Sequence, residues 1–75
     1  MNKLTVADSD ISPEAIIGHF YRFGETGQVY EVLGIEKPLE NGDYLMKILL
    51  PLTKEEAKVK LSDILNDPEE GRVKH

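Results

Sequence analysis

The chain lacks cysteine altogether, and it has no apolar run long enough to cross a membrane as a helix. Without cysteine, no disulfide, thiolate nucleophile or cysteine-ligated metal can form. A spanning helix needs about 18 or more consecutive apolar residues, so we expect no transmembrane segment. The start of the chain has no basic stretch followed by an apolar one, since Asp8 and Asp10 interrupt it. These absences predict a cytoplasmic protein without a signal peptide.

Positive charge is also scarce. Nine basic residues stand against fourteen acidic ones, which gives a net charge of −5. A duplex phosphate backbone repels such a chain, because non-specific affinity for nucleic acid comes mainly from lysine and arginine contacts. Nucleic acid is therefore the less expected partner, and the lack of a spanning segment predicts no membrane partner. The partner that we expect is another protein, or a second copy of the chain.

With 75 residues, the chain is long enough for one small domain. We place this domain at 13–70. The segment 1–12 has only scattered apolar residues and is expected to be a flexible tail, within which a short strand at 4–6 is the alternative. The segment 71–75 is expected to be a polar tail.

The longest apolar run, 42–50, predicts the central strand of a sheet. It follows Asn41-Gly42, a dipeptide typical of two-residue hairpin turns, in which both central positions need positive φ. It ends at Pro51, which has no N–H to continue a ladder. Because most of its residues are apolar or aromatic, we expect it to be buried on most of both faces.

The segment 28–36 is a strand by composition, and the two-residue turn determines how it would pair with the central strand. Ile35 would then lie opposite Ile48, a favourable cross-strand pair. Gly34 is expected to mark a bulge at which the strand changes its inward face.

Two further segments carry conflicting signals. Residues 12–24 open with a Ser-Pro-Glu helix start and close on glycine, yet Gly18 and many β-branched and aromatic residues favour a strand. Residues 53–67 open with Thr-Lys-Glu-Glu, which fits a capping box of one long helix. The rival interpretation is a strand over 57–61 followed by a short helix that Ser62 caps. From the residues alone, both segments stay open.

Two blocks of the chain are similar to a known pattern. They are 18–27 (Gly-His-Phe-Tyr-Arg-Phe-Gly-Glu-Thr-Gly) with Tyr-Glu-Val-Leu at 30–33, and 42–48 (Gly-Asp-Tyr-Leu-Met-Lys-Ile) with Leu-Ser-Asp-Ile-Leu-Asn-Asp-Pro-Glu at 61–69. Together they resemble a family of short bacterial proteins known only as a domain of unknown function. The resemblance implies a β-meander and favours strands in both contested segments. It implies no activity that any residue would carry.

We therefore predict a mainly β domain, a small antiparallel meander or SH3-like barrel of four to five strands with a short C-terminal helix. The alternative is an α+β fold, in which helices at 13–23 and 54–66 flank a small sheet.

The sequence shows no pattern of a catalytic or metal site. His19 has no second histidine or orienting carboxylate near it in the sequence, which a general base or a metal ligand needs. Gly24-x-x-Gly27 lacks the Gly-Lys-Ser/Thr ending of a phosphate loop. We expect no catalytic residue, no metal and no cofactor, and therefore a protein that is not an enzyme.

The function that we predict is a small protein-interaction module. Five aromatic side chains cannot all be buried in so small a core, and exposed aromatics are typical of protein contacts. The alternative is a small nucleic-acid-binding or regulatory protein, because lysines of two strands would share one face. A strand edge protected by lysines explains the same pattern without a ligand. The candidate interaction surface consists of Tyr21, Arg22, Tyr30, Lys47, Lys58 and Lys60.

Overall fold

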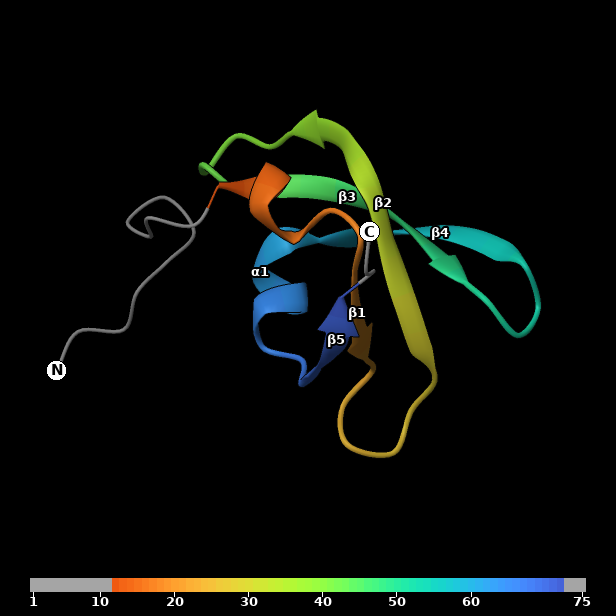
Figure 1. The fold of residues 1–75 in the computed structure, drawn as a ribbon. Helices are drawn as coiled ribbons and strands as arrows, with labels where there is room; N and C mark the ends of the chain where they lie inside the picture. The colour runs from red at the N-terminus through yellow and green to blue at the C-terminus, as the bar shows by residue number, and fades with distance from the viewer. Residues whose placement is uncertain (1–11, 73–75) are drawn as a thin grey trace, which may run out of the picture.

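The computed structural model describes residues 12–72, which form one antiparallel sheet of five strands with a short helix and a 3₁₀ turn (Figure 1). The elements are η1 (Pro13–Ile16), β1 (His19–Arg22), β2 (Val29–Pro38), β3 (Tyr44–Leu50), β4 (Glu55–Lys60), α1 (Leu61–Leu65) and β5 (Glu69–Arg72). The strand order is β4-β3-β2-β1-β5. Strands β1 to β4 form a meander, and α1 returns the chain so that β5 pairs with β1.

The mainly β prediction is confirmed, and the α+β alternative with helices at 13–23 and 54–66 is wrong. Within residues 12–72 the sheet is open, because β4 and β5 lie at its two ends and do not pair with each other. The barrel form of the prediction is therefore not confirmed. No helix in this part of the chain is long and apolar enough to span a membrane.

The first contested segment is one 3₁₀ turn followed by a strand. Pro13 suits the start of η1, but the turn ends after Ile16, because Gly18 adopts a φ of 90° that a helix does not allow. The Gly18 N–H donates to the carbonyl of Val32 at 2.8 Å, which brings the chain alongside β2. The β-branched and aromatic residues that follow then form β1.

The turn between β2 and β3 is longer than predicted. Pro38 pairs with Tyr44, so five residues connect the strands, and Ile48 lies opposite Val32 instead of Ile35. The predicted two-residue turn at Asn41-Gly42 is wrong, because the longer loop closes through a hydrogen bond from the Leu39 N–H to the Asp43 carbonyl at 2.9 Å.

The predicted bulge at Gly34 is confirmed. The register of β2 shifts between Val32 and Gly34, and again between Ile35 and Lys37. Each extra residue changes which side chains point inward, so Val32 is fully buried and Ile35 packs on the same core.

The core lies on one face of the sheet, under α1 and η1. Its buried members are Ile16, Tyr21, Tyr30, Val32, Met46, Ile48, Leu61 and Ile64. Along β3, Met46 and Ile48 are buried, whereas Leu45, Lys47 and Leu49 alternate with them and are partly exposed. The expectation that this strand is buried on both faces is therefore wrong, since the described elements cover only one of them.

The C-terminal part also differs from the prediction in two details. Glu69–Arg72 pairs with β1 as β5, so the strand continues into residues that we assigned to a polar tail. The short helix is present, but its N-cap is Lys60 and not Ser62. The flexible tail predicted for 1–12, with its alternative strand at 4–6, lies outside the described residues apart from Ser12.

Candidate functional site

An open groove runs between the tips of the β1–β2 and β3–β4 hairpins. It has a volume of about 800 Å³. Its walls come from both tips and consist of Arg22, Phe23, Thr26, Gly27, Gln28, Val29, Leu50, Pro51 and Leu52. Two of these, Phe23 and Leu52, are among the few large apolar side chains of residues 12–72 that are exposed, at 38% and 83%. The groove is therefore an accessible apolar surface.

The aromatic wall of the groove rests on the core. The ring of Phe23 lies on that of Tyr30, with centroids 4.4 Å apart, and Tyr30 stacks in turn on Tyr21 at 6.1 Å. Such pairs stabilise aromatic side chains beyond the area that they bury. Phe23 is consequently held in place while part of its ring stays exposed.

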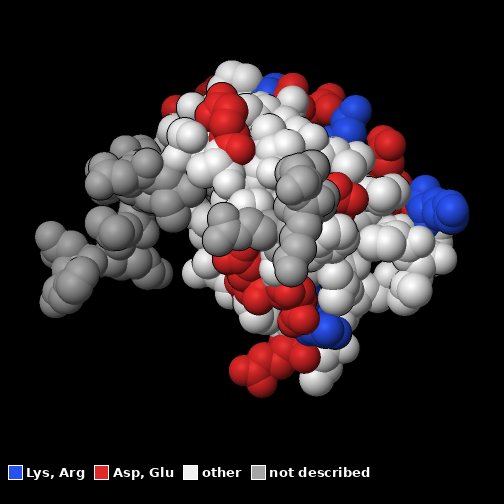
Figure 2. Space-filling model, in the orientation of Figure 1, with Lys and Arg blue, Asp and Glu red and all other residues white. Residues whose placement is uncertain are grey.

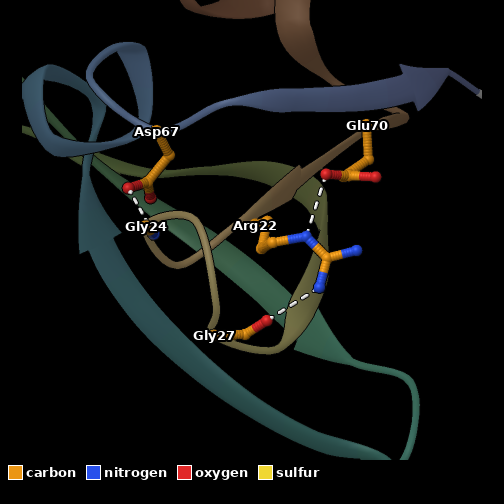
Figure 3. Close-up of polar contacts among 5 residues, drawn as sticks. All are labelled: Arg22, Gly24, Gly27, Asp67 and Glu70. Carbon is orange, nitrogen blue, oxygen red and sulfur yellow. Dashed lines mark hydrogen bonds and ion pairs between the residues drawn. The ribbon is translucent and has the colours of Figure 1, made fainter.

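The β1–β2 turn is fixed by residues from the C-terminal end of the chain (Figure 3). The Gly24 N–H donates to Asp67 Oδ1 at 3.2 Å, and the other oxygen of this carboxylate accepts the Tyr30 hydroxyl at 2.6 Å. Arg22 lies between two acceptors, Glu70 at 2.9 Å from its Nε and the Gly27 carbonyl at 3.0 Å from its Nη1. The turn is therefore tied to the segment just before β5 and to β5 itself.

These contacts also shift the pKa values of Tyr30 and Glu70. Burial, with the hydrogen bond and charge of Asp67, raises the pKa of the Tyr30 hydroxyl far above its ordinary value. The hydrogen bond and charge of Arg22 lower the pKa of Glu70. Tyr30 thus stays neutral and Glu70 stays ionised at neutral pH, which keeps both contacts intact.

The turn needs glycine at two positions. Gly24 has a φ of 63°, which L-residues rarely adopt. A Cβ at Gly27 would clash with the carbonyl oxygen and the Cβ of Phe23. The Gly27 N–H instead donates to that carbonyl at 2.9 Å. The Phe-Gly-x-x-Gly pattern is thus the sequence of a tight hairpin turn.

The opposite wall is the tip of the β3–β4 hairpin. Leu52 follows Pro51 at this tip and extends into solvent. Lys54 has a φ of 61°, a left-handed conformation that is unusual for a residue with a side chain, and its N–H donates to the Leu50 carbonyl at 2.7 Å. Leu52 was not among the predicted interaction residues, although an apolar residue in the middle of a polar turn was the available signal.

The predicted interaction residues do not all lie together. Tyr21 and Tyr30 are buried, with 5% and 0% exposure, so they support the groove but cannot contact a partner. Arg22 does line the groove. Phe23 is the exposed aromatic that composition led us to expect.

The predicted lysines share the sheet face that points away from the core. Lys58 lies directly opposite Lys47, and Lys60 opposite Leu45. An acidic side chain lies beside one of them, since Lys58 Nζ is 3.6 Å from Glu36 Oε2. Lys60 also lines a second hollow, together with residues 37–41. In the view of Figure 2, blue and red groups alternate along the upper right of the molecule and form no continuous basic patch.

His19 has one acidic neighbour in space. Its Nδ1 lies 2.8 Å from Glu69 Oε2, within ion-pair distance, but the two groups lack the alignment of a hydrogen bond. Within residues 12–72, no group of three or more histidine, aspartate or glutamate side chains is arranged to hold a metal ion.

Asp43 is a structural residue that the sequence analysis missed. It is 5% exposed and joins the β2–β3 loop to α1, because Oδ1 accepts the Ser62 N–H at 3.1 Å and Oδ2 accepts the Ser62 hydroxyl at 2.6 Å. Burial would raise the pKa of this carboxyl, but the hydrogen bonds from Ser62 and Tyr44, with the charge of Lys60, hold it below its ordinary value. Asp43 therefore caps α1 from another loop, a role for which its local sequence gives no signal.

The match to a known family covers these turn and core residues. A model of the family of unknown function DUF5397 matches residues 8–71. The chain belongs to this family. The match includes the Phe-Gly-x-x-Gly turn, the strand after Asn41-Gly42 and the Asp67-Pro68 segment that braces the groove. A search of curated proteins found no match.

Proposed function

We propose that this protein is a small, non-enzymatic interaction module that binds a segment of another protein in the groove between its two hairpin tips. The exposure of Leu52 and Phe23 on opposite walls is the observation that supports the proposal. A large apolar side chain that is exposed in water without a structural role is typical of a contact surface. The proposal retains the expected cytoplasmic location.

The occupant of such a groove would be an extended segment with apolar side chains. Val29, Leu50 and Pro51 line the groove beside the two exposed residues, and Arg22 is its charged member. Because Arg22 is already bonded to Glu70 and Gly27, it would act as part of the wall and not as a free cation.

Photocrosslinking in the native host tests this surface. A photoreactive phenylalanine analogue in place of Gln28, which is exposed and lines the groove, should form adducts with another protein. The same analogue at Glu40, an exposed residue of the β2–β3 loop, is the matched control and should form few. Leu52→Glu should remove the Gln28-site adducts, because it places a charge in the apolar wall. Equal adducts at both sites, or adducts that survive Leu52→Glu, would contradict the proposal.

A nucleic-acid-binding function has one observation in its favour, the pairing of Lys47 with Lys58 on a face that also contains Lys60. Single strands bind to cations combined with exposed aromatic rings, and Tyr21 and Tyr30 are buried. We therefore expect at most weak, salt-sensitive binding of a single-stranded oligonucleotide when amide shifts are followed at near-physiological salt. Micromolar binding centred on the lysine face would reverse the order of the two functions.

A further inference from the structure

The outer edge of β4 is an open strand edge. Among residues 12–72, β4 pairs with β3 on one side, and no strand lies on its other side. Figure 1 shows the β3–β4 hairpin projecting away from α1. Every residue of β4 except Val59 is exposed. A free edge of this kind presents backbone N–H and C=O groups that a further strand can bind.

The charge pattern of β4 favours one kind of partner strand. Glu55 and Glu56 form its acidic half, and Lys58 and Lys60 form its basic half, with Ala57 between them. In an antiparallel pair of two such strands, the acidic half of each faces the basic half of the other, whereas a parallel pair would place like charges together. We infer that β4 pairs antiparallel with β4 of a second copy of this chain, so that the two sheets become one.

The register of this pair follows from the faces of the sheet. Glu56 and Lys58 lie opposite Leu49 and Lys47 on the outer face, whereas Ala57 lies opposite Ile48 on the core face. For the outer faces of the two sheets to join into one face, the two-fold axis must pass through a residue position. The residue at that position then lies opposite its own copy. With Glu56 or Lys58 on the axis, like charges would meet. With Ala57 on the axis, each Glu56 faces Lys58 of the other copy, and a small neutral side chain occupies the centre.

The same register also compensates an unfavourable like-charge pair within each chain. Lys47 and Lys58 are directly opposite each other, and a like-charge pair in this position is destabilising. Glu36 compensates from one side. Glu56 of the second copy supplies a second carboxylate on the open side. The dimer depends on no part of the groove, so it is independent of the proposed function.

The interface is short, and the dimer should therefore be weak. A pair of six-residue strands buries less surface than the roughly 1,200 Å² of a stable complex. Sedimentation equilibrium of the full chain, up to about 1 mM, should show reversible dimerisation. A chain that stays monomeric over this whole range would overturn the inference.

Charge reversal tests the register. Glu56→Lys places two lysines opposite each other across the axis, and Lys58→Glu places two carboxylates there. Each variant alone should dimerise at least about tenfold more weakly than the wild type, because both symmetric pairs change from attraction to repulsion. Glu56→Lys also makes the chain less negative, so a general effect of net charge would strengthen its association instead.

Two combinations complete the test. An equal mixture of the Glu56→Lys and Lys58→Glu chains should form a heterodimer, and the chain with both changes should dimerise like the wild type, since each restores two opposite-charge pairs. Circular dichroism verifies that every variant is folded. Unchanged dimerisation of the single variants, or a mixture that does not associate, would overturn the proposed pairing.

Discussion

The two hairpin tips that form the groove are stabilised in different ways. The β1–β2 hairpin is hydrogen-bonded to residues that lie far away in the sequence. Gly24 bonds to Asp67, which is 43 positions later, and Arg22 bonds to Glu70, which is 48 positions later. Within residues 12–72, the hydrogen bonds of the β3–β4 tip stay inside its own hairpin, from Thr53 to Glu55 and from the Lys54 N–H to Leu50. One wall of the groove is thus braced, which means held by hydrogen bonds to distant parts of the chain. The other wall is free of such bonds within residues 12–72.

This difference bears on how the groove can bind. A braced wall loses little conformational entropy when a partner arrives, whereas a free tip loses more but can adapt its shape. In the proposed function, the aromatic wall would fix the position of the bound segment, and the Leu52 wall would adapt its shape to it.

Both tips depend on the shared core beneath them, so the largest effect is expected there. Ile48→Ala should lower the free energy of unfolding by about 2–5 kcal/mol, because Ile48 is fully buried on β3. Leu52→Ala, at the exposed tip, should change it by less than about 0.5 kcal/mol. Urea denaturation measures both. A wild-type midpoint for Ile48→Ala would show that β3 is assigned the wrong inward face.

Removing the brace should be the next largest effect. Asp67→Ala should cost about 1.5–3 kcal/mol, because it leaves the buried Tyr30 hydroxyl without its charged acceptor. Thr53→Ala, which removes the matched bond at the free tip, should cost less than about 0.5 kcal/mol. Similar losses for the two variants in thermal denaturation would remove the distinction between the tips.

The β2–β3 loop, like the β1–β2 turn, is held by a distant residue, because Ser62 donates to the Asp43 carboxylate. The strength of this contact depends on pH. The folded pKa of Asp43 lies below its ordinary value of 3.8. Its stabilisation is therefore complete above that value, and it is lost as the pH falls through the lower folded pKa. Ser62→Ala should cost about 1–2 kcal/mol at neutral pH, because it removes a hydrogen bond to this carboxylate.

Urea titrations at several pH values test this dependence. The difference between Ser62→Ala and the wild type should shrink as the pH falls below about 4. A constant difference over the acidic range would show that Asp43 does not carry the effect.

A further small effect is expected where the backbone of each tip is left-handed. Lys54→Gly should stabilise the fold by up to about 0.5–1 kcal/mol, because glycine adopts a φ near 61° without strain. The matched change Gly24→Ala in the braced turn should destabilise by about 1 kcal/mol or more, since Gly24 has a φ of 63°. Destabilisation by Lys54→Gly in differential scanning calorimetry would contradict the left-handed conformation of this turn.

The sequence predicted the elements better than their connections. The apolar run before Pro51 and the glycine at 34 were sufficient for an interior strand and a bulge, because both depend on local residue types, although the middle strand of the sheet is β2 and not β3. The two-residue turn at Asn41-Gly42 was wrong, since the loop closes between Leu39 and Asp43, and Asp43 is also held by Ser62, which is 19 positions away. The pairing of Glu69–Arg72 with β1 was missed because short polar segments become strands only through their neighbours.

The candidate site was predictable only in part. Composition indicated that an aromatic side chain would be exposed, and this residue is Phe23. Tyr21 and Tyr30 were assigned to the surface, yet both are buried, because alternation along β1 and β2 directs them to the core. The groove itself forms from two tips whose closeness depends on the whole sheet.

Amide hydrogen exchange, followed by NMR on the wild-type chain, tests the difference between the two tips most directly. The amides of Phe23, Gly24 and Gly27, which are bonded within the braced turn, should exchange more slowly than those of Leu52 and Thr53. Exchange at the β1–β2 turn that is as fast as, or faster than, exchange at the β3–β4 tip would contradict the account.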